Sequence, residues 1–170
     1  MPFPLNDRAN MLTIRTILCP TDFSESAQHA FRLAAALARD HRARLLVLHV
    51  ATPPPFVFYG ELQRALEQPG GYRHELEDRL RQVYEPGPAV TVEYRVVVGD
   101  PGAEIVSIAR EAACDLIVMG THGRTGLGRL LIGSVAEQVL RGAHCPVLTM
   151  KVPAAGTPPA AEPGPTGETR

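Results

Sequence analysis

The chain has 170 residues and a formal net charge of −1, a length that suits one domain with a sizeable core. The near-neutral charge argues against nucleic acid or an anionic membrane as a partner. No apolar run approaches the roughly 20 residues of a membrane-spanning helix, and no N-terminal pattern is typical of a signal peptide, so we expect a cytoplasmic protein.

The first half of the chain alternates short apolar segments with amphipathic ones. Residues 14–19 predict a first strand, and residues 24–40 predict a helix whose apolar side chains recur at helical spacing. Residues 45–50 predict a second strand, and a run of prolines then breaks the chain. Residues 61–84 have leucines spaced for a helix, which the Pro-Gly-Gly sequence at residues 69–71 is expected to interrupt.

The second half continues the same alternation. Residues 90–98 predict a third strand, and Asp100 is expected to cap a helix over residues 101–113, in which Pro101 suits the first position. Gly142 is expected to cap the last helix at its C-terminus. We expect a fourth strand over residues 115–119, followed by a glycine-rich loop over residues 120–133. The last helix is expected over residues 134–141 and the fifth strand over residues 147–152.

Alternating strands and helices predict a parallel sheet with helices on both faces. In such sheets ligands bind beyond the carboxyl ends of the strands, where the strand order reverses. The predicted domain covers residues 13–152 and follows an N-terminal extension, residues 1–12. Residues 153–170 are rich in proline and glycine and have no large apolar side chain, so we expect a disordered tail.

The glycine-rich loop carries the clearest functional signal. It contains Gly120, Gly123 and Gly133, and Ser134 opens the next helix with Glu137 three residues later, the spacing of a capping box. Such a loop lets backbone N–H groups approach an anion at a helix N-terminus, where the helix dipole adds to the attraction. We therefore interpret the loop as a phosphate-binding site in which Ser134 caps the helix and also donates to a phosphate.

The loop matches neither of two common phosphate-binding motifs. A Walker A loop needs a lysine before its hydroxyl residue, and the only lysine of the chain is Lys151. A dinucleotide fingerprint needs a third glycine where Leu131 stands. Backbone N–H groups must therefore do most of the binding, with Arg124 and Arg129 as candidates for charge pairing with the anion.

The spacing Gly-x2-Gly-x9-Gly-Ser resembles the nucleotide-binding signature of the universal stress protein family. Pro-Thr-Asp-Phe-Ser at residues 20–24, His-Val at residues 49–50 and Gly-Asp-Pro at residues 99–101 follow the order of that family's landmarks. The resemblance covers about residues 13–152. It implies an α/β fold with a five-stranded parallel sheet of order 3-2-1-4-5, of the adenine nucleotide alpha hydrolase-like, Rossmann-like kind.

The same resemblance implies an ATP site, with AMP and ADP as alternatives and with or without Mg²⁺. Thr21 and Val50 match positions that contact the base and sugar, and Asp22 matches one that bonds the ribose hydroxyls or lies near a metal. The sequence alone leaves another role open for Asp22, as a helix cap with Glu25 three residues later. The candidate nucleotide-binding residues are Pro20, Thr21, Asp22, Val50, Met119, Gly120, Gly123, Arg124, Gly133, Ser134 and Val135.

The resemblance favours a stress-response regulator that binds a nucleotide over a metabolic enzyme. Phosphoryl transfer needs charge neutralisation and a positioned nucleophile, and the sequence offers neither a loop lysine nor a Walker B pattern. A slow ATPase, an adenylyl-transferring hydrolase and a cyclic AMP sensor remain alternatives, with no residue assigned as catalytic. Residues 146–152 are expected at a sheet edge with apolar side chains on both faces, and the family pairs this edge between protomers, which implies a homodimer.

Overall fold

The computed structural model describes residues 13–52, 58–67, 71–121 and 133–151. A five-stranded sheet in the order β3-β2-β1-β4-β5 forms its centre, and each neighbouring pair of strands is parallel. The strands are Thr16–Thr21 (β1), Arg44–Ala51 (β2), Val92–Val98 (β3), Leu116–Gly120 (β4) and Val147–Met150 (β5). The predicted fold class and strand order are confirmed. The predicted N-terminal extension and C-terminal tail lie outside the described residues.

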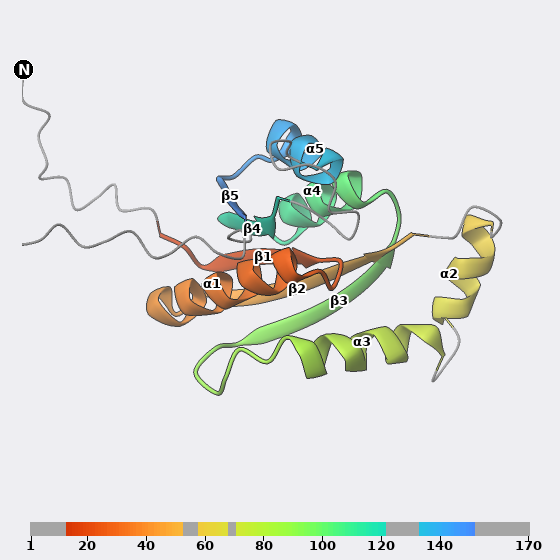
Figure 1. Cartoon of the computed structure of the whole chain (residues 1–170), viewed down its shortest axis with the longest axis horizontal. Coiled ribbons are helices and arrows are strands. Elements are labelled where there is room, and N and C mark those ends of the chain that lie inside the picture. Colours follow the sequence, from red (N-terminus) through yellow and green to blue (C-terminus); the bar gives the residue numbers. More distant parts are fainter. Residues whose placement is uncertain (1–12, 53–57, 68–70, 122–132, 152–170) are drawn as a thin grey trace, which may run out of the picture.

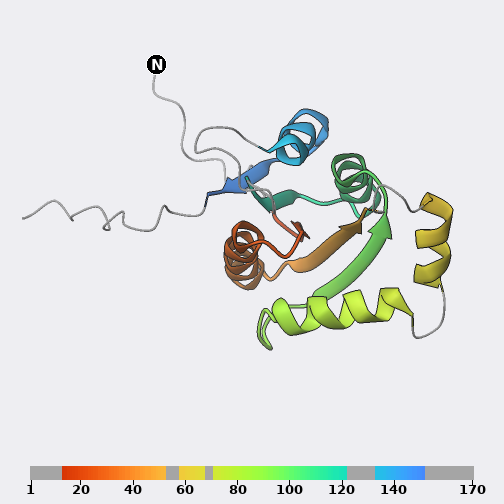
Figure 2. The ribbon, with the colours of Figure 1, turned by 45° about the vertical axis from the view of Figure 1, so that its right-hand side comes forward.

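Helices cover both faces of the sheet (Figures 1 and 2). The helices are Glu25–His41 (α1), Tyr59–Glu67 (α2), Tyr72–Val83 (α3), Pro101–Glu111 (α4) and Ser134–Gly142 (α5). In Figure 2, α1 and α3 lie below the sheet and α4 and α5 lie above it. The helix α2 ends before the break predicted around residues 69–71 and α3 begins after it, although residues 68–70 themselves lie outside the described residues. The helix α2 stands beyond the carboxyl ends of β2 and β3 (Figure 1).

The alternation of side chains along a strand explains the two helical layers. In β2, Leu45 and Val47 belong to the apolar cluster that includes side chains of α1 and α3. Leu46 and Leu48 belong to the cluster on the other face, with side chains of α4 and α5. All four side chains are fully buried, as a central parallel strand requires.

The strand β1 begins at Thr16 and ends at Thr21, so it starts and ends two residues later than predicted. It pairs with β2 up to its last residue, but with β4 only at Ile17 and Leu18. Pro20 has no N–H for a ladder, and it lies beyond the last pair with β4, where no such donor is needed. The two strands therefore stop pairing in mid-strand, at the position where the strand order reverses.

Candidate functional site

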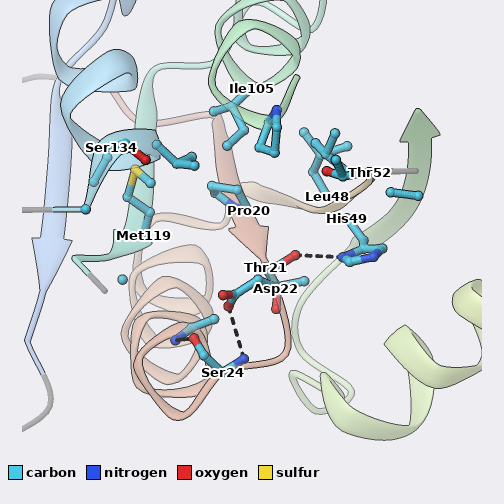
Figure 3. Close-up of a pocket in the computed structure, with 18 of the residues that line it drawn as sticks. Pro20, Thr21, Asp22, Ser24, Leu48, His49, Thr52, Ile105, Met119 and Ser134 are labelled. Atoms are coloured by element: carbon cyan, nitrogen blue, oxygen red, sulfur yellow. Dashed lines mark hydrogen bonds between the residues drawn. The ribbon is translucent and has the colours of Figure 1, made fainter. Parts of the chain in front are cut away.

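A cavity of about 750 Å³ opens where β1 and β4 stop pairing (Figure 3). Its volume lies within the range of roughly 300–1,000 Å³ that small-molecule sites occupy. The candidate residues that the structure describes all line it, namely Pro20, Thr21, Asp22, Val50, Met119, Gly120, Gly133, Ser134 and Val135. Gly123, Arg124 and Arg129 lie outside the described residues. The structure thus gathers the ends of three strands and the start of α5 around one space.

The turn after β1 is shaped by its own polar side chains. The Thr21 hydroxyl accepts from the Phe23 N–H at 2.9 Å, and the Asp22 carboxylate accepts from the Ser24 N–H at 3.0 Å. Ser24 is the N-cap of α1, and its Oγ accepts from the Ala27 N–H at 3.2 Å. The sequence left open whether Asp22 caps the helix; in the structure Ser24 is the cap of α1. Asp22 instead stabilises the turn that precedes this helix.

His49, near the end of β2, holds the same turn from the other side. Its Nδ1 lies 2.8 Å from the Thr21 carbonyl oxygen (Figure 3). Since a carbonyl oxygen only accepts, Nδ1 is the protonated nitrogen of this bond. Sequence reasoning gave His49 no role of its own, and the only signal for it was its position next to Val50.

Apolar side chains form much of the cavity wall. Leu48 and Val50 come from β2, Met119 from β4, and Pro101 and Ile105 from α4. Sequence reasoning missed Leu48 and Ile105, because inward apolar positions of a strand and a helix are first read as core. They are part of the core and also line the cavity, so they offer apolar surface to a ligand.

The helix α2 closes one side of the cavity with Glu61, Leu62 and Ala65. The sequence predicted a helix here but gave no sign that it reaches the site. Glu61 and Asp22 are the carboxylates of the described lining. Within residues 13–52, 58–67, 71–121 and 133–151, no group of three His, Cys, Asp or Glu side chains could hold a metal ion.

The start of α5 differs from the prediction in one respect. The N-cap is Gly133, with φ −61° and ψ 151°, and its carbonyl accepts from the Glu137 N–H at 2.9 Å. Ser134 is the first helical residue and makes no capping hydrogen bond, so the predicted cap was wrong. Gly142 is likewise the last residue of α5, and Ala143 is the C-cap. The Ser134 hydroxyl lies at the cavity and is not held by a capping hydrogen bond to the helix backbone.

The two ends of the glycine-rich loop are tied together. The Gly133 N–H donates to the Thr121 carbonyl at 2.8 Å, and the Thr121 N–H donates to the Met150 carbonyl of β5 at 2.9 Å. Gly120 packs against the first turn of α1, because a Cβ on it would lie 2.3 Å from the Ser26 Oγ. The N-terminus of α5 is therefore fixed beside the end of β4, and residues of its first turn line the cavity.

Known proteins resemble the chain along most of its length. The family model described as "Universal stress protein family" matches residues 13–151. A universal stress protein of Methanocaldococcus jannaschii is 35% identical over 148 residues, which cover 82% of this chain and 83% of the relative.

Solved structures show the same likeness. The structure of hypothetical protein MJ0577, also of Methanocaldococcus jannaschii, is 31% identical with a TM-score of 0.67, and the match covers 84% of this chain and 99% of that one. A universal stress protein crystallised in complex with cAMP is 25% identical with a TM-score of 0.61, covering 81% and 97% of the two chains.

Proposed function

Because the chain belongs to the universal stress protein family, we propose that its cavity binds an adenine nucleotide, with ATP as the principal ligand. The observation that carries this proposal is the convergence of the Thr21-Asp22 turn, the Gly120 end of β4 and the start of α5 on one cavity. In the proposed role the protein is a cytoplasmic regulator of the stress response, and its regulatory activity depends on whether a nucleotide is bound.

The proposed pose follows from the chemistry of the walls. The adenine base packs between Val50 and Ile105, whose side chains supply apolar surface. The ribose hydroxyls lie near the Asp22 carboxylate, and the phosphates lie at the N-terminus of α5 near Ser134. Any Mg²⁺ in this proposal enters with the nucleotide phosphates, because the described residues offer no cluster that holds it beforehand.

Backbone donors and burial of the base together support moderate affinity in this pose. Hydrogen bonds to a charged group contribute about 1.5–3 kcal/mol each. Micromolar binding needs about 8 kcal/mol net of association costs. Three or four such bonds, together with burial of the base against Leu48 and Ile105, reach that value.

Cyclic AMP is the second candidate ligand. The solved relative in complex with cAMP supports the adenine nucleotide class and gives a specific reason to test the cyclic phosphate. A slow ATPase or an adenylyl-transferring hydrolase remains the enzymatic alternative. We favour binding without rapid turnover, because the glycine-rich loop of residues 120–133 contains no lysine.

We also propose that the protein is a homodimer that joins through β5. This strand pairs with β4 on one side, and among the described residues no strand covers its other side. Leu148 of β5 and Leu140 of α5 are exposed large apolar side chains. An uncovered apolar edge strand invites pairing with another copy.

Titration calorimetry on nucleotide-free protein tests the proposed ligand. We expect saturable binding of ATP and AMP, and competition with cAMP shows whether the cyclic nucleotide enters the same site. Ser134→Ala should weaken ATP binding about tenfold or more, because a hydrogen bond to a charged group is lost. Ser107→Ala is the matched control, since Ser107 is exposed on α4 and does not line the cavity. Absence of saturable binding by all three nucleotides would refute the proposal.

A further inference from the structure

The turn that borders the cavity contains a residue in an unusual conformation. Phe23 has φ 65°, in the left-handed region that bulky side chains rarely adopt. Such a conformation persists only where surrounding contacts hold it. Phe23 lies between Asp22 and Ser24, which are joined by a hydrogen bond, so contacts that hold Phe23 also hold the backbone of this turn.

Three side chains surround the Phe23 ring. The His49 ring centroid lies 4.8 Å away, and the Tyr84 ring centroid lies 6.0 Å away. The Arg79 guanidinium carbon lies 4.1 Å from the centroid of the Phe23 ring, within the distance at which a cation is attracted to an aromatic face. Two of these contacts come from α3 and its C-cap residue.

Tyr84 is itself firmly placed. It is fully buried, its carbonyl accepts from the Tyr94 hydroxyl at 2.7 Å, and its ring packs edge-on against Phe31 at 5.0 Å. Its hydroxyl is hydrogen-bonded to the hydroxyl of Thr21, a residue that lines the cavity. The C-terminal end of α3, with Arg79 and Tyr84, therefore contacts the turn after β1 at both Thr21 and Phe23.

We propose that Arg79 and Tyr84 are positioning residues for the ligand: through Phe23 and Thr21 they hold the turn so that Thr21 and Asp22 face the cavity. The ligand part of this inference rests on the proposed function. Neither Arg79 nor Tyr84 lines the cavity, so both act through the turn. No motif in the sequence singles out either residue, since their contacts with residues 21–23 arise only in the fold.

The chain offers a close control for Arg79. Arg81 is also an exposed arginine of α3, and its guanidinium carbon lies 5.8 Å from the ring centroid of Tyr94 in β3. It pairs with Glu77 and Asp78 on its own helix and makes no contact with Phe23. Arg79→Ala and Arg81→Ala each remove one guanidinium above one ring. Only the first removes a contact with the turn, so general effects of losing a charge from α3 are shared by both variants.

The test measures the turn and the ligand separately. Amide hydrogen exchange in ligand-free protein reports the turn, because the Phe23 and Ser24 N–H groups donate to Thr21 and Asp22. We expect faster exchange at both amides in Arg79→Ala and wild-type exchange in Arg81→Ala. In calorimetry we expect Arg79→Ala to weaken AMP binding about threefold to tenfold. Arg79→Lys, which keeps a cation above the ring, should restore most of both properties.

A double variant checks that Arg79 acts through Phe23. Glycine adopts φ near 65° without strain, so Phe23→Gly keeps the turn accessible while it removes the ring. In this background Arg79→Ala should cause no further loss of AMP affinity.

The outcomes that would overturn the positioning role of Arg79 differ from those that would overturn the proposed function. Equal exchange and equal affinity in Arg79→Ala and Arg81→Ala would overturn the positioning role, as would faster exchange at the turn with unchanged AMP affinity. Absence of AMP and ATP binding by the wild type would overturn the proposed function and the ligand part of this inference together. The exchange comparison would then still decide whether Arg79 holds the turn.

Discussion

The hydroxyl of Tyr84 is hydrogen-bonded to the hydroxyl of Thr21, which joins the end of α3 to the end of β1. The contact is buried, and burial raises the pKa of Tyr84 from its ordinary value of 10.0 to about 12. Cys19 lies on the same strand, and burial raises the pKa of its thiol from 9.0 to about 12. Both groups are therefore held in their neutral forms by the fold.

These raised pKa values predict a loss of stability at alkaline pH. The unfolded chain releases the protons of Cys19 and Tyr84 near pH 9 and pH 10, whereas the folded chain keeps them until about pH 12. The free energy of unfolding should thus be fully retained below pH 9 and should fall as the pH rises toward 12. Each unit of raised pKa corresponds to about 1.4 kcal/mol.

Tyr84→Phe isolates the tyrosine's share of this loss. At pH 7 the variant should be less stable by about 1 kcal/mol, because one buried hydrogen bond is lost. Between pH 10 and pH 12 its stability should fall less steeply than that of the wild type, since the ionisation of Tyr84 no longer contributes. Urea unfolding at a series of pH values measures both slopes, and identical slopes would contradict the assignment.

The second prediction concerns the close approach of β4 to α1. A Cβ on Gly120 would lie 2.3 Å from the Ser26 Oγ, 2.9 Å from its Cβ and 3.0 Å from its backbone carbon. Gly120→Ala should therefore destabilise the protein by about 1–3 kcal/mol through overpacking.

Gly60→Ala provides the matched comparison. Gly60 lies in α2, and the nearest atom to an added Cβ is the Arg64 Nη2 at 3.8 Å. Gly60 is the second residue of α2 and has open space around it, so alanine there should be neutral or should stabilise by up to about 0.5–1 kcal/mol. Chemical denaturation of the two variants checks the contrast, and a Gly120→Ala protein as stable as the wild type would disprove the tight contact.

The third prediction concerns the proposed dimer. Leu148 of β5 is 38% exposed, and a glutamate there would place charge at the centre of the proposed interface. Leu148→Glu should convert a dimer into a monomer in light scattering at micromolar concentration. Val83→Glu, at a 41% exposed position of α3, should leave the mass unchanged. A monomeric wild type would exclude the proposed dimer at that concentration.

Much of the fold was predictable because hydrophobic patterning determines it locally. The buried apolar runs of β2 and β4, the Asp100 cap of α4 and the glycine break between α2 and α3 were all read from adjacent residues. The strand order came from the family resemblance, since patterning alone does not say which strands are neighbours. Helix and strand ends were less certain, because single residues decide them.

The cap of α5 shows why such ends are difficult to predict. Ser134 and Glu137 have the spacing of a capping box, yet Gly133 adopts the extended cap conformation instead. The Gly133 N–H also donates to the Thr121 carbonyl, a bond that joins the two ends of the loop and accompanies this cap. That bond forms only in the folded chain, so no local sequence pattern predicts it.

The same reasoning applies to the candidate site. Residues within motifs, such as Asp22 and Gly120, were predicted from the sequence, and the structure brings them to one cavity. His49, Ile105 and the α2 residues were missed because their relation to the cavity depends on tertiary packing.

The most direct test of the nucleotide site is a titration of isotopically labelled, nucleotide-free protein with ATP, followed by the shifts of its backbone amide resonances. Our account predicts saturable shifts at Val50, Gly120 and Ser134, with little change around Ser107 and Gly142, which line a separate groove of α4 and α5. Shifts confined to that groove, or none that saturate, would contradict it.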